Sequence, residues 1–247
     1  MKTTRKDFSV ITKNKISNEI YVSKHQDRFI YIINKINNYY SDKSSKEKIS
    51  VLDFGSHTGI LGVLFQHFNY KITSIDLEEV IDDYNEVYEN NNLEVDKLLP
   101  NWEKLPYPDN SFDSIIFTEV LEHLYESPIK ILEEFYRILK PNGILLITTP
   151  NVNKIENKIR FLFHQNIYQD IKRYCYNPRY SLHFREYTEK DLKILLSEFI
   201  KFNKLTFSYF DYVGGRTPTK RLLQRIVFIF SSIFRNFGGS ICVIAKK

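Results

Sequence analysis

The sequence has few of the residues that mark secreted, zinc-binding or low-complexity proteins. Its two cysteines, Cys175 and Cys242, lie too far apart for the paired spacing of a zinc site. We expect them to be reduced thiols of a cytoplasmic protein. The first residues are polar and rich in lysine with no apolar segment behind them, so no secretory signal is predicted. No internal repeat and no low-complexity tract is visible in the sequence.

The C-terminal tail lacks acidic residues. Of the 35 lysines and arginines, seven lie in residues 216–247, which leaves 28 beside all 30 acidic residues in the rest of the chain. The net charge of +5 therefore belongs to the tail, and it indicates an anionic neighbour such as a phosphate-bearing substrate or a membrane surface. The apolar run 226–234 is shorter than the ~20 residues that cross a bilayer. We expect residues 220–237 to pack on their own sheet or on a second subunit, and the alternative is peripheral contact with a membrane.

The chain does contain enough apolar surface for one well-packed core. Its 247 residues are 43% hydrophobic and 15% aromatic, which excludes a disordered chain. The alternation of strands and helices predicts a single α/β domain over residues 1–247. Hydrophobic periodicity predicts helices at 21–40, 58–68, 77–90, 129–139 and 188–196, and strands at 49–54, 71–76, 93–96, 114–118, 144–149, 199–212 and 239–246. The predicted parts are a helical arm (1–48), a core (49–150), a cap (151–187) and C-terminal helices and strands (188–247).

The strongest motif begins where the first predicted strand ends. Asp53 is followed by two glycines, Gly55 and Gly59, and then by a helical pattern. Glycines at such a turn let the backbone approach a ligand over the carboxyl end of the strand. The second strand ends in Asp76, about 20 residues after the turn, where a nucleotide-binding fold has an acceptor for two ribose hydroxyls. We therefore favour a ribose-containing cofactor over a merely buried strand-to-helix turn.

The glycine spacing distinguishes between cofactors. A dinucleotide site usually has G-x-G-x-x-G, whereas this chain has Gly55-x-x-x-Gly59 with Asp53 two residues before the first glycine. This spacing resembles motif I of the class I S-adenosylmethionine-dependent methyltransferases, D-x-G-x-G-x-G. His57 stands where that family usually has its middle glycine. Either the turn is rearranged, or the His57 ring lines the cofactor pocket.

Two further stretches carry the same resemblance. Residues 100–117 look like the family's segment that covers the adenine, and 137–143, Arg-Ile-Leu-Lys-Pro-Asn-Gly, resemble its motif III. The resemblance implies a doubly wound Rossmann-like sheet, mostly parallel with an antiparallel last strand, and helices on both faces. Trp102 either stacks on the purine or anchors a loop, and Asp113 is expected to be a structural capping acid. The implied donor-binding residues are Asp53, Gly55, Ser56, His57, Gly59, Asp76, Leu77, Asn101, Trp102 and Glu119.

The acceptor is expected beside a group of acids and histidines. If residues from Glu119 onward are helical, Glu122 and His123 share its face at the carboxyl edge of the sheet, and His183 arrives from the cap. The group resembles the metal site of small-RNA 3′-terminal 2′-O-methyltransferases, and its Glu-x-x-Glu-His half that of metal-binding quinone O-methyltransferases. Two interpretations stay open. All four residues bind a divalent ion such as Mg, Mn or Zn, or His123, His183 and Glu119 are metal-free catalytic residues with a histidine as the base.

The resemblance implies a methyltransferase that uses S-adenosylmethionine, and we predict O-methylation of a hydroxyl on a small molecule, a glycan or a phosphorylated metabolite. An RNA end stays among the alternatives for the acceptor, and an oligomer among those for assembly. A nicotinamide-dependent oxidoreductase would also use Asp76, but it should show the missing pyrophosphate glycines. A non-catalytic binding module with this fold is the third alternative, and His57 is the residue that argues for it.

Overall fold

The computed structural model describes residues 2–13, 19–41, 49–99, 102–168, 170–176, 182–211 and 238–247. Contacts divide the chain into two compact units, Met1–Ile116 and Phe117–Lys247. Two sequence predictions, the adenine contact of Asn101 and the basic helix at 220–237, lie outside the described residues. No helix in the described ranges is long and apolar enough to cross a membrane.

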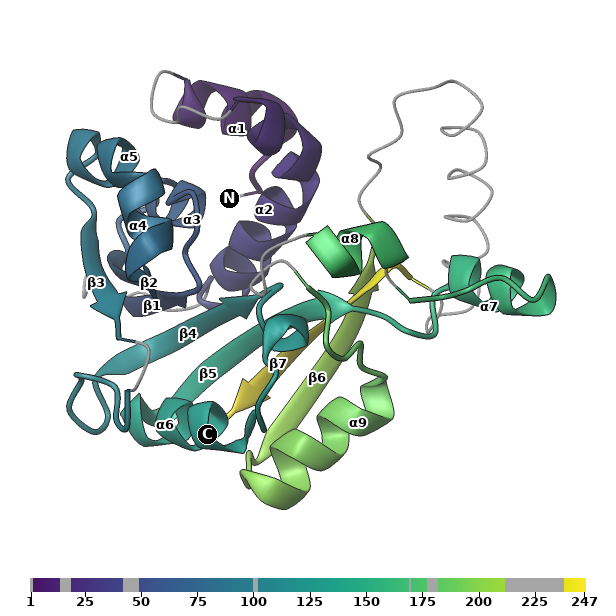
Figure 1. The fold of residues 1–247 in the computed structure, drawn as a ribbon. Coiled ribbons are helices and arrows are strands. Elements are labelled where there is room, and N and C mark those ends of the chain that lie inside the picture. The colour runs from purple at the N-terminus through teal and green to yellow at the C-terminus, as the bar shows by residue number, and fades with distance from the viewer. Residues whose placement is uncertain are drawn as a thin grey trace. The chain divides into compact units, whose positions relative to one another are not determined.

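The strands form a seven-stranded sheet in the order β3-β2-β1-β4-β5-β7-β6 (Figure 1). Strand β2 pairs in parallel with both β1 and β3, whereas β7 runs antiparallel to β5 and β6. The predicted Rossmann-like sheet with an antiparallel last strand is therefore confirmed. The bounds are β1 Ser50–Phe54, β2 Lys71–Leu77, β3 Glu94–Leu98, β4 Phe112–Thr118, β5 Leu139–Pro150, β6 Lys204–Phe210 and β7 Ser240–Lys246.

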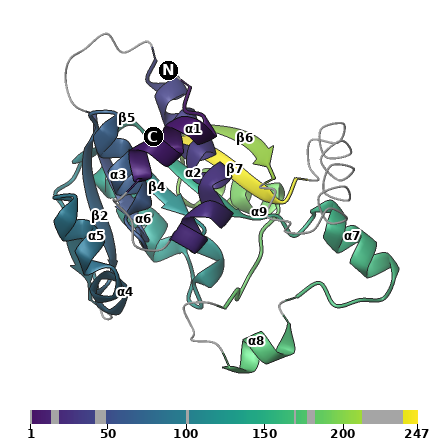
Figure 2. The same ribbon diagram turned by 90° about the horizontal axis from the view of Figure 1, so that it is seen from above.

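Unit 1 is built around the apolar helix that follows the glycine turn. Helix α3, Ile60–His67, is buried from its first residue to Phe65 and packs on β2. Two N-terminal helices, α1 Arg5–Thr12 and α2 Glu19–Tyr39, contact it, as Figure 2 shows. The arm is thus part of the core, with Phe8 buried and a capping box between Thr4 and Asp7 at the start of α1.

Several element bounds differ from the sequence prediction. The strand predicted at 199–212 is shorter, Lys204–Phe210, because residues up to Phe199 form a π-helical turn. The helix predicted at 77–90 is divided into α4, Glu78–Asp83, and α5, Asn85–Asn90. Tyr84 lies between them with φ −121° and ψ 16°, and its ring packs on His57. Strand β5 begins at Leu139 instead of 144, directly after α6. The Lys247 ammonium donates to the carbonyls of Tyr136 and Leu139 at the end of α6. Within the segment 140–143 predicted as a turn, Asn142 has φ of 65°, and the pairing with β7 begins at Ile144.

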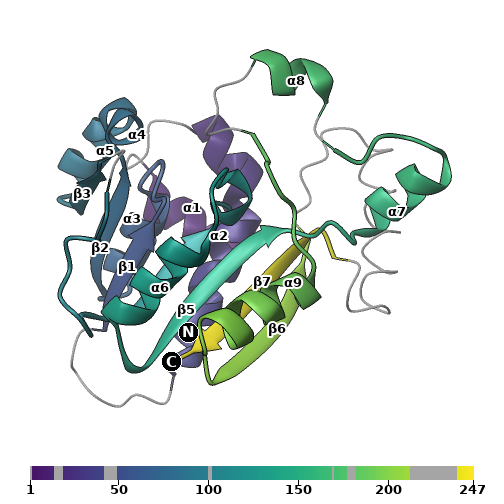
Figure 3. The same ribbon diagram turned by 60° about the horizontal axis from the view of Figure 1, so that its bottom comes forward.

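Unit 2 combines the antiparallel strands with two kinds of helix. Helix α6, Ile129–Ile138, buries its apolar face on β5, and α9, Glu189–Lys193, continues into a π-helical turn, Ile194–Phe199, beside β6. Figure 3 shows α6 and α9 lying along the strands, whereas α7, Ile155–Leu162, and α8, Ile171–Tyr176, stand away from them. Both projecting helices belong to the segment predicted as the cap.

Candidate functional site

The glycine turn after β1 has the backbone conformation that its glycines predict. Gly55 and Gly59 have φ of 79° and 70°, and His57 between them has φ of 46°. A Cβ at Gly59 would meet Tyr88 at 3.3 Å, so both the conformation and the close approach favour glycine there. His57 therefore adopts the left-handed conformation of the glycine it replaces.

The turn is held by strand β2 and by one buried tyrosine. The amide of His57 donates to Asp76 Oδ2 and the amide of Leu77 to Asp76 Oδ1, both at 2.7 Å. Tyr88 donates its hydroxyl to the His57 carbonyl at 2.9 Å and lies 2.8 Å from Ser56 Oγ. The predicted ribose acceptor thus also organises the turn, while the contribution of Tyr88 gave no signal in the sequence.

Asp53 is a buried carboxylate whose two oxygens have no hydrogen-bond partner among the described residues. Its side chain is 1% exposed, and burial together with the nearby Asp76 raises its pKa to about 8. An unpartnered buried carboxyl is costly, and a bound cation or hydrogen-bond donor relieves the cost. The α-amino group of a methionine-like ligand is such a donor, so this residue fits the methyl donor that motif I implies.

The His57 ring packs between two aromatic side chains. Its centroid lies 5.0 Å from that of Tyr21 and 4.9 Å from that of Tyr84. Burial and then the charge of Arg28 lower the pKa of His57 to about 4, so the ring is neutral at pH 7. Arg28 donates to the Tyr21 hydroxyl at 3.1 Å. Helix α2 therefore supplies part of the surroundings of the turn, which the sequence did not indicate.

Two other sequence predictions concern the start of β4 and the loop before it. Asp113 Oδ2 accepts from the Ser50 amide at 3.0 Å and from its hydroxyl at 2.8 Å, so Asp113 is a structural acid that binds the start of β1 and not the predicted helix or turn cap. Trp102 is half-buried, and its amide donates to the Leu99 carbonyl at 3.2 Å. Its contact with an adenine stays a prediction.

In unit 2, the prediction of a helix that begins at Glu119 and carries Glu122 and His123 on one face is wrong. Glu119 has φ of 54°, a strained conformation for a residue with a side chain, and only Leu121–His123 form a helical turn, of the 3-10 type. The Glu119 amide donates to the Thr148 carbonyl at 2.8 Å, and its Oε1 accepts from the Thr148 hydroxyl at 2.9 Å. These bonds to β5 bend the chain out of β4 before a helix can begin.

Glu122 and His123 nevertheless meet the cap segment. Glu122 is 1% exposed, and its Oε2 accepts from the Thr149 hydroxyl at 2.9 Å. Its carbonyl accepts the Phe184 amide at 2.8 Å. His123 Nδ1 lies 2.9 Å from the Leu182 carbonyl. The end of the cap is thus bonded to the 3-10 turn at two points.

Three of the four predicted metal ligands come together. Ligand atoms of Glu122, His123 and His183 all lie within 4.8 Å of one another, and Glu119 is not part of this group. The two imidazole rings meet edge to face with centroids 4.9 Å apart, and His123 Nε2 is 3.9 Å from Glu122 Oε1. No metal is needed to explain the hydrogen bonds, but the donor set suits one.

The surroundings select one tautomer for each histidine. A carbonyl can only accept, so the bond from His123 Nδ1 to Leu182 places the proton on Nδ1 and leaves the lone pair on Nε2. His183 Nδ1 lies 3.3 Å from Glu186 Oε1. Burial would raise the pKa of Glu186, but the bond from His183 and the charge of Lys154 lower it overall. The Glu186 carboxylate is therefore ionised and can only accept, which places the proton on His183 Nδ1.

Burial is the main reason that the pKa of His123 is lowered, the bond to Leu182 opposes it, and His183 lowers it further. A neutral imidazole with its Nε2 lone pair can accept a proton from a hydroxyl or bind a metal. The orientation of each ring through Nδ1 is what metal-binding histidines usually show. The chemistry of this group is therefore that of a general base or of a divalent metal site.

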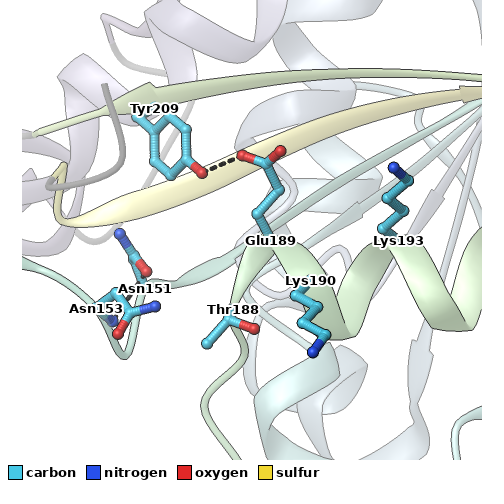
Figure 4. Close-up of a pocket in the computed structure, with 7 residues that line it drawn as sticks. All are labelled: Asn151, Asn153, Thr188, Glu189, Lys190, Lys193 and Tyr209. Carbon is cyan, nitrogen blue, oxygen red and sulfur yellow. Dashed lines mark hydrogen bonds between the residues drawn. The ribbon is translucent and has the colours of Figure 1, made fainter. Parts of the chain in front are cut away.

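A separate hollow of unit 2 lies between the end of β5, the start of α9 and β6 (Figure 4). Its volume is about 450 Å³, and the Tyr209 hydroxyl donates to Glu189 across it. The lining residues are Asn151, Asn153, Thr188, Glu189, Lys190, Lys193 and Tyr209. None of these residues belongs to the predicted site.

The fold, the turn with Asp53 and Asp76, and the position of the glycines define a class I S-adenosylmethionine-dependent methyltransferase. A family profile described as "Methyltransferase domain" matches residues 24–199, more than half of the chain. The chain belongs to this family.

Curated relatives match over shorter stretches. A probable S-adenosylmethionine-dependent methyltransferase of Mycolicibacterium smegmatis is 39% identical over 51 residues, 21% of this chain and 20% of the relative. The ubiquinone/menaquinone biosynthesis C-methyltransferase UbiE of Hydrogenovibrio crunogenus is 43% identical over 53 residues, 22% and 20% of the two chains. An uncharacterized protein of Methanocaldococcus jannaschii is 30% identical over 128 residues, 52% and 49%. The chain thus spans between a fifth and half of these relatives.

Solved structures match over nearly the whole chain. A SAM-dependent methyltransferase from Archaeoglobus fulgidus has a TM-score of 0.59 at 18% identity and covers 93% of this chain and 100% of its own. One from Aquifex aeolicus has a TM-score of 0.55 at 19% identity, covering 97% and 98%. At these identities the likeness concerns the fold.

Proposed function

We propose that this protein transfers the methyl group of S-adenosylmethionine to a hydroxyl of a small molecule, a sugar or a phosphorylated metabolite, and that the chain acts as one methyltransferase domain. The observation that favours a hydroxyl as the methyl acceptor is the pair of oriented histidines beside Glu122. A hydroxyl must lose its proton as it attacks, and His123 Nε2 is a neutral acceptor for that proton.

For the donor, the proposal assigns the methionine amino group and the ribose to residues of unit 1. Asp53 accepts from the methionine amino group, because its buried oxygens otherwise lack a donor. Asp76 accepts from the ribose hydroxyls, and Leu77 lies at the same end of β2. The other proposed donor-binding residues are Gly55, Ser56, His57, Gly59, Asn101, Trp102 and Glu119. The donor supplies a methyl group on a sulfonium, whose departure leaves a neutral thioether.

For the acceptor, the proposed steps are one bond made, one bond broken and one proton moved. The hydroxyl oxygen forms a bond to the methyl carbon as the carbon–sulfur bond breaks. The proton of the hydroxyl passes to Nε2 of His123 or His183. Glu186 and the Leu182 carbonyl keep each ring in the accepting tautomer. In this proposal Glu119 positions the turn through Thr148.

A divalent ion is the second candidate, and the clustering of Glu122, His123 and His183 favours it. These residues would hold Mg, Mn or Zn, with Glu119 as a further ligand only if it left Thr148. A bound ion lowers the pKa of a coordinated hydroxyl. Methyl transfer after exhaustive chelation, with and without added metal, separates the two mechanisms. Full activity in chelator would exclude the metal mechanism. Activity that only added metal restores would exclude a metal-free histidine base.

The first test asks which cofactor binds. A ligand at about 100 Kd raises the unfolding free energy by ~2.7 kcal/mol, which a thermal-shift assay detects. We expect stabilisation by S-adenosylmethionine and by S-adenosylhomocysteine, and none by NAD. Stabilisation by NAD alone would favour an oxidoreductase, and no stabilisation by either would favour a non-catalytic module.

The second test asks which atom is methylated. UbiE is described as a C-methyltransferase, so carbon is the natural competitor to oxygen. The protein is incubated with donor carrying a labelled methyl group and with panels of phenols, sugars and sugar phosphates, and the product is analysed by mass spectrometry and NMR. A methyl on oxygen supports the proposal, and a methyl on carbon contradicts the hydroxyl acceptor while leaving the donor assignment intact.

A further inference from the structure

Large apolar side chains are exposed on the projecting segment of unit 2 that carries α7 and α8. Seven of them are between 56% and 86% exposed: Phe161, Leu162, Phe163, Tyr168, Ile171, Tyr174 and Tyr176. We call these seven the α7–α8 surface. Elsewhere in the described part of unit 2, strands β5 and β7 bury nearly all of their apolar side chains. Phe161, Leu162 and Phe163 are consecutive, and contiguous exposed apolar side chains usually mark an interaction site.

The arrangement of the apolar side chains argues against a protein groove. A helix that docks in a groove presents one face, with anchors three or four residues apart. Here Phe161, Leu162 and Phe163 are consecutive at the end of α7, and every residue from Lys158 to Asn166 is exposed. Consecutive residues point in different directions around a helix, so the end of α7 is apolar on several sides. A lipid interface can surround such an end, whereas a single groove cannot.

The charges of the same segment are mostly positive. Lys158, Arg160 and Lys172 are exposed beside the apolar side chains. The exposed acid Asp170 accepts the amide of Lys172 at the start of α8. Aromatic residues with a polar tip, such as the three tyrosines, are favoured at the boundary between lipid and water. Exposed lysines and arginines near that boundary attract anionic lipids.

We propose that the α7–α8 surface binds peripherally to membranes that contain anionic lipids. Phe161, Leu162 and Phe163 enter the interface, the tyrosines lie at the headgroups, and Lys158, Arg160 and Lys172 meet the lipid phosphates. This inference does not depend on the identity of the methyl acceptor. It concerns a described segment, and it is distinct from the basic helix predicted at 220–237.

The test is co-sedimentation of the full chain with vesicles. One set is phosphatidylcholine alone and the other contains phosphatidylglycerol as well. Two variants are compared with the wild type: Phe161→Ser/Phe163→Ser, which alters the α7–α8 surface, and Phe199→Ser as a matched control. Phe199 is 60% exposed and lies in the π-helical turn after α9. Binding of S-adenosylhomocysteine and the melting temperature check that each variant is folded.

We expect the wild type and Phe199→Ser to bind the anionic vesicles equally and the double variant to bind about tenfold more weakly or worse. Binding should weaken in ~1 M salt, where the screening length falls to ~3 Å. No binding by the wild type, or equal binding by the double variant, would overturn the inference. A dimer in sedimentation velocity that Phe161→Ser/Phe163→Ser abolishes, with no vesicle binding, would assign the surface to a second copy instead.

Discussion

Replacing Asp53 with asparagine should change stability and donor affinity in opposite directions. The pKa of Asp53 is raised from 3.8 to about 8, first by burial and then by Asp76. Between these two values the folded protein binds a proton that the unfolded chain has released. Stability of the ligand-free protein therefore falls as pH rises through this window, and it levels off above about pH 8.

The size of the effect follows from the same shift. A change of about four pKa units corresponds to at most ~5 kcal/mol of unfolding free energy at pH 8, and side-chain relaxation and water entry reduce it. Asparagine has nearly the same shape and no charge, but its amide also lacks partners in this place. We therefore expect Asp53→Asn to gain ~2 kcal/mol relative to wild type on going from about pH 5 to about pH 8.

Urea unfolding of the ligand-free protein at the two pH values measures this difference, and Glu86→Gln, an exposed acid on α5, is the matched control. Calorimetry with S-adenosylhomocysteine measures the predicted change in donor affinity. Affinity of the wild type should rise with pH as Asp53 ionises, and Asp53→Asn should bind at least about tenfold more weakly at about pH 8. A stability difference that is independent of pH would contradict the raised pKa of Asp53. A variant that binds as tightly as wild type would refute the assignment of Asp53 to the amino group.

Three further substitutions test the remaining parts of the proposal. Asp76→Ala should lower affinity for S-adenosylhomocysteine at least about tenfold by calorimetry, because charge-assisted bonds to the ribose are lost, and unchanged affinity would place the donor elsewhere. Glu186→Gln should lower kcat more than KM and move the acid limb of the pH profile, because a carboxylate no longer fixes the tautomer of His183; a profile identical to wild type contradicts that role. Thr149→Val should cost ~1–3 kcal/mol in urea unfolding, because buried Glu122 loses its hydroxyl partner, and a neutral effect would show that the bond contributes nothing to stability.

Local sequence was sufficient to predict the β1–turn–α3 unit. The apolar run up to Phe54, the glycines at 55 and 59 and the acid that ends β2 lie within about 25 residues, and backbone sterics and periodicity act over that range. The antiparallel last strand was predicted only through the family resemblance, and it is confirmed. The structural role of Asp113 was predicted from its place at the start of β4, and Ser50 is its partner.

Only the tertiary structure decided how the groups of the candidate site are held. Tyr88 reaches the glycine turn from 31 residues away, and the Leu182 carbonyl orients His123 from 59 residues away. The Glu119 turn was predicted as helix because residues three and four apart suggested one face, but hydrogen bonds to Thr148 on β5 bend the chain away. Periodicity describes a residue's neighbours along one element. The histidine tautomers, the positive φ of Glu119 and the lack of a described partner for Asp53 depend on groups that folding brings from other elements, so no local pattern reveals them.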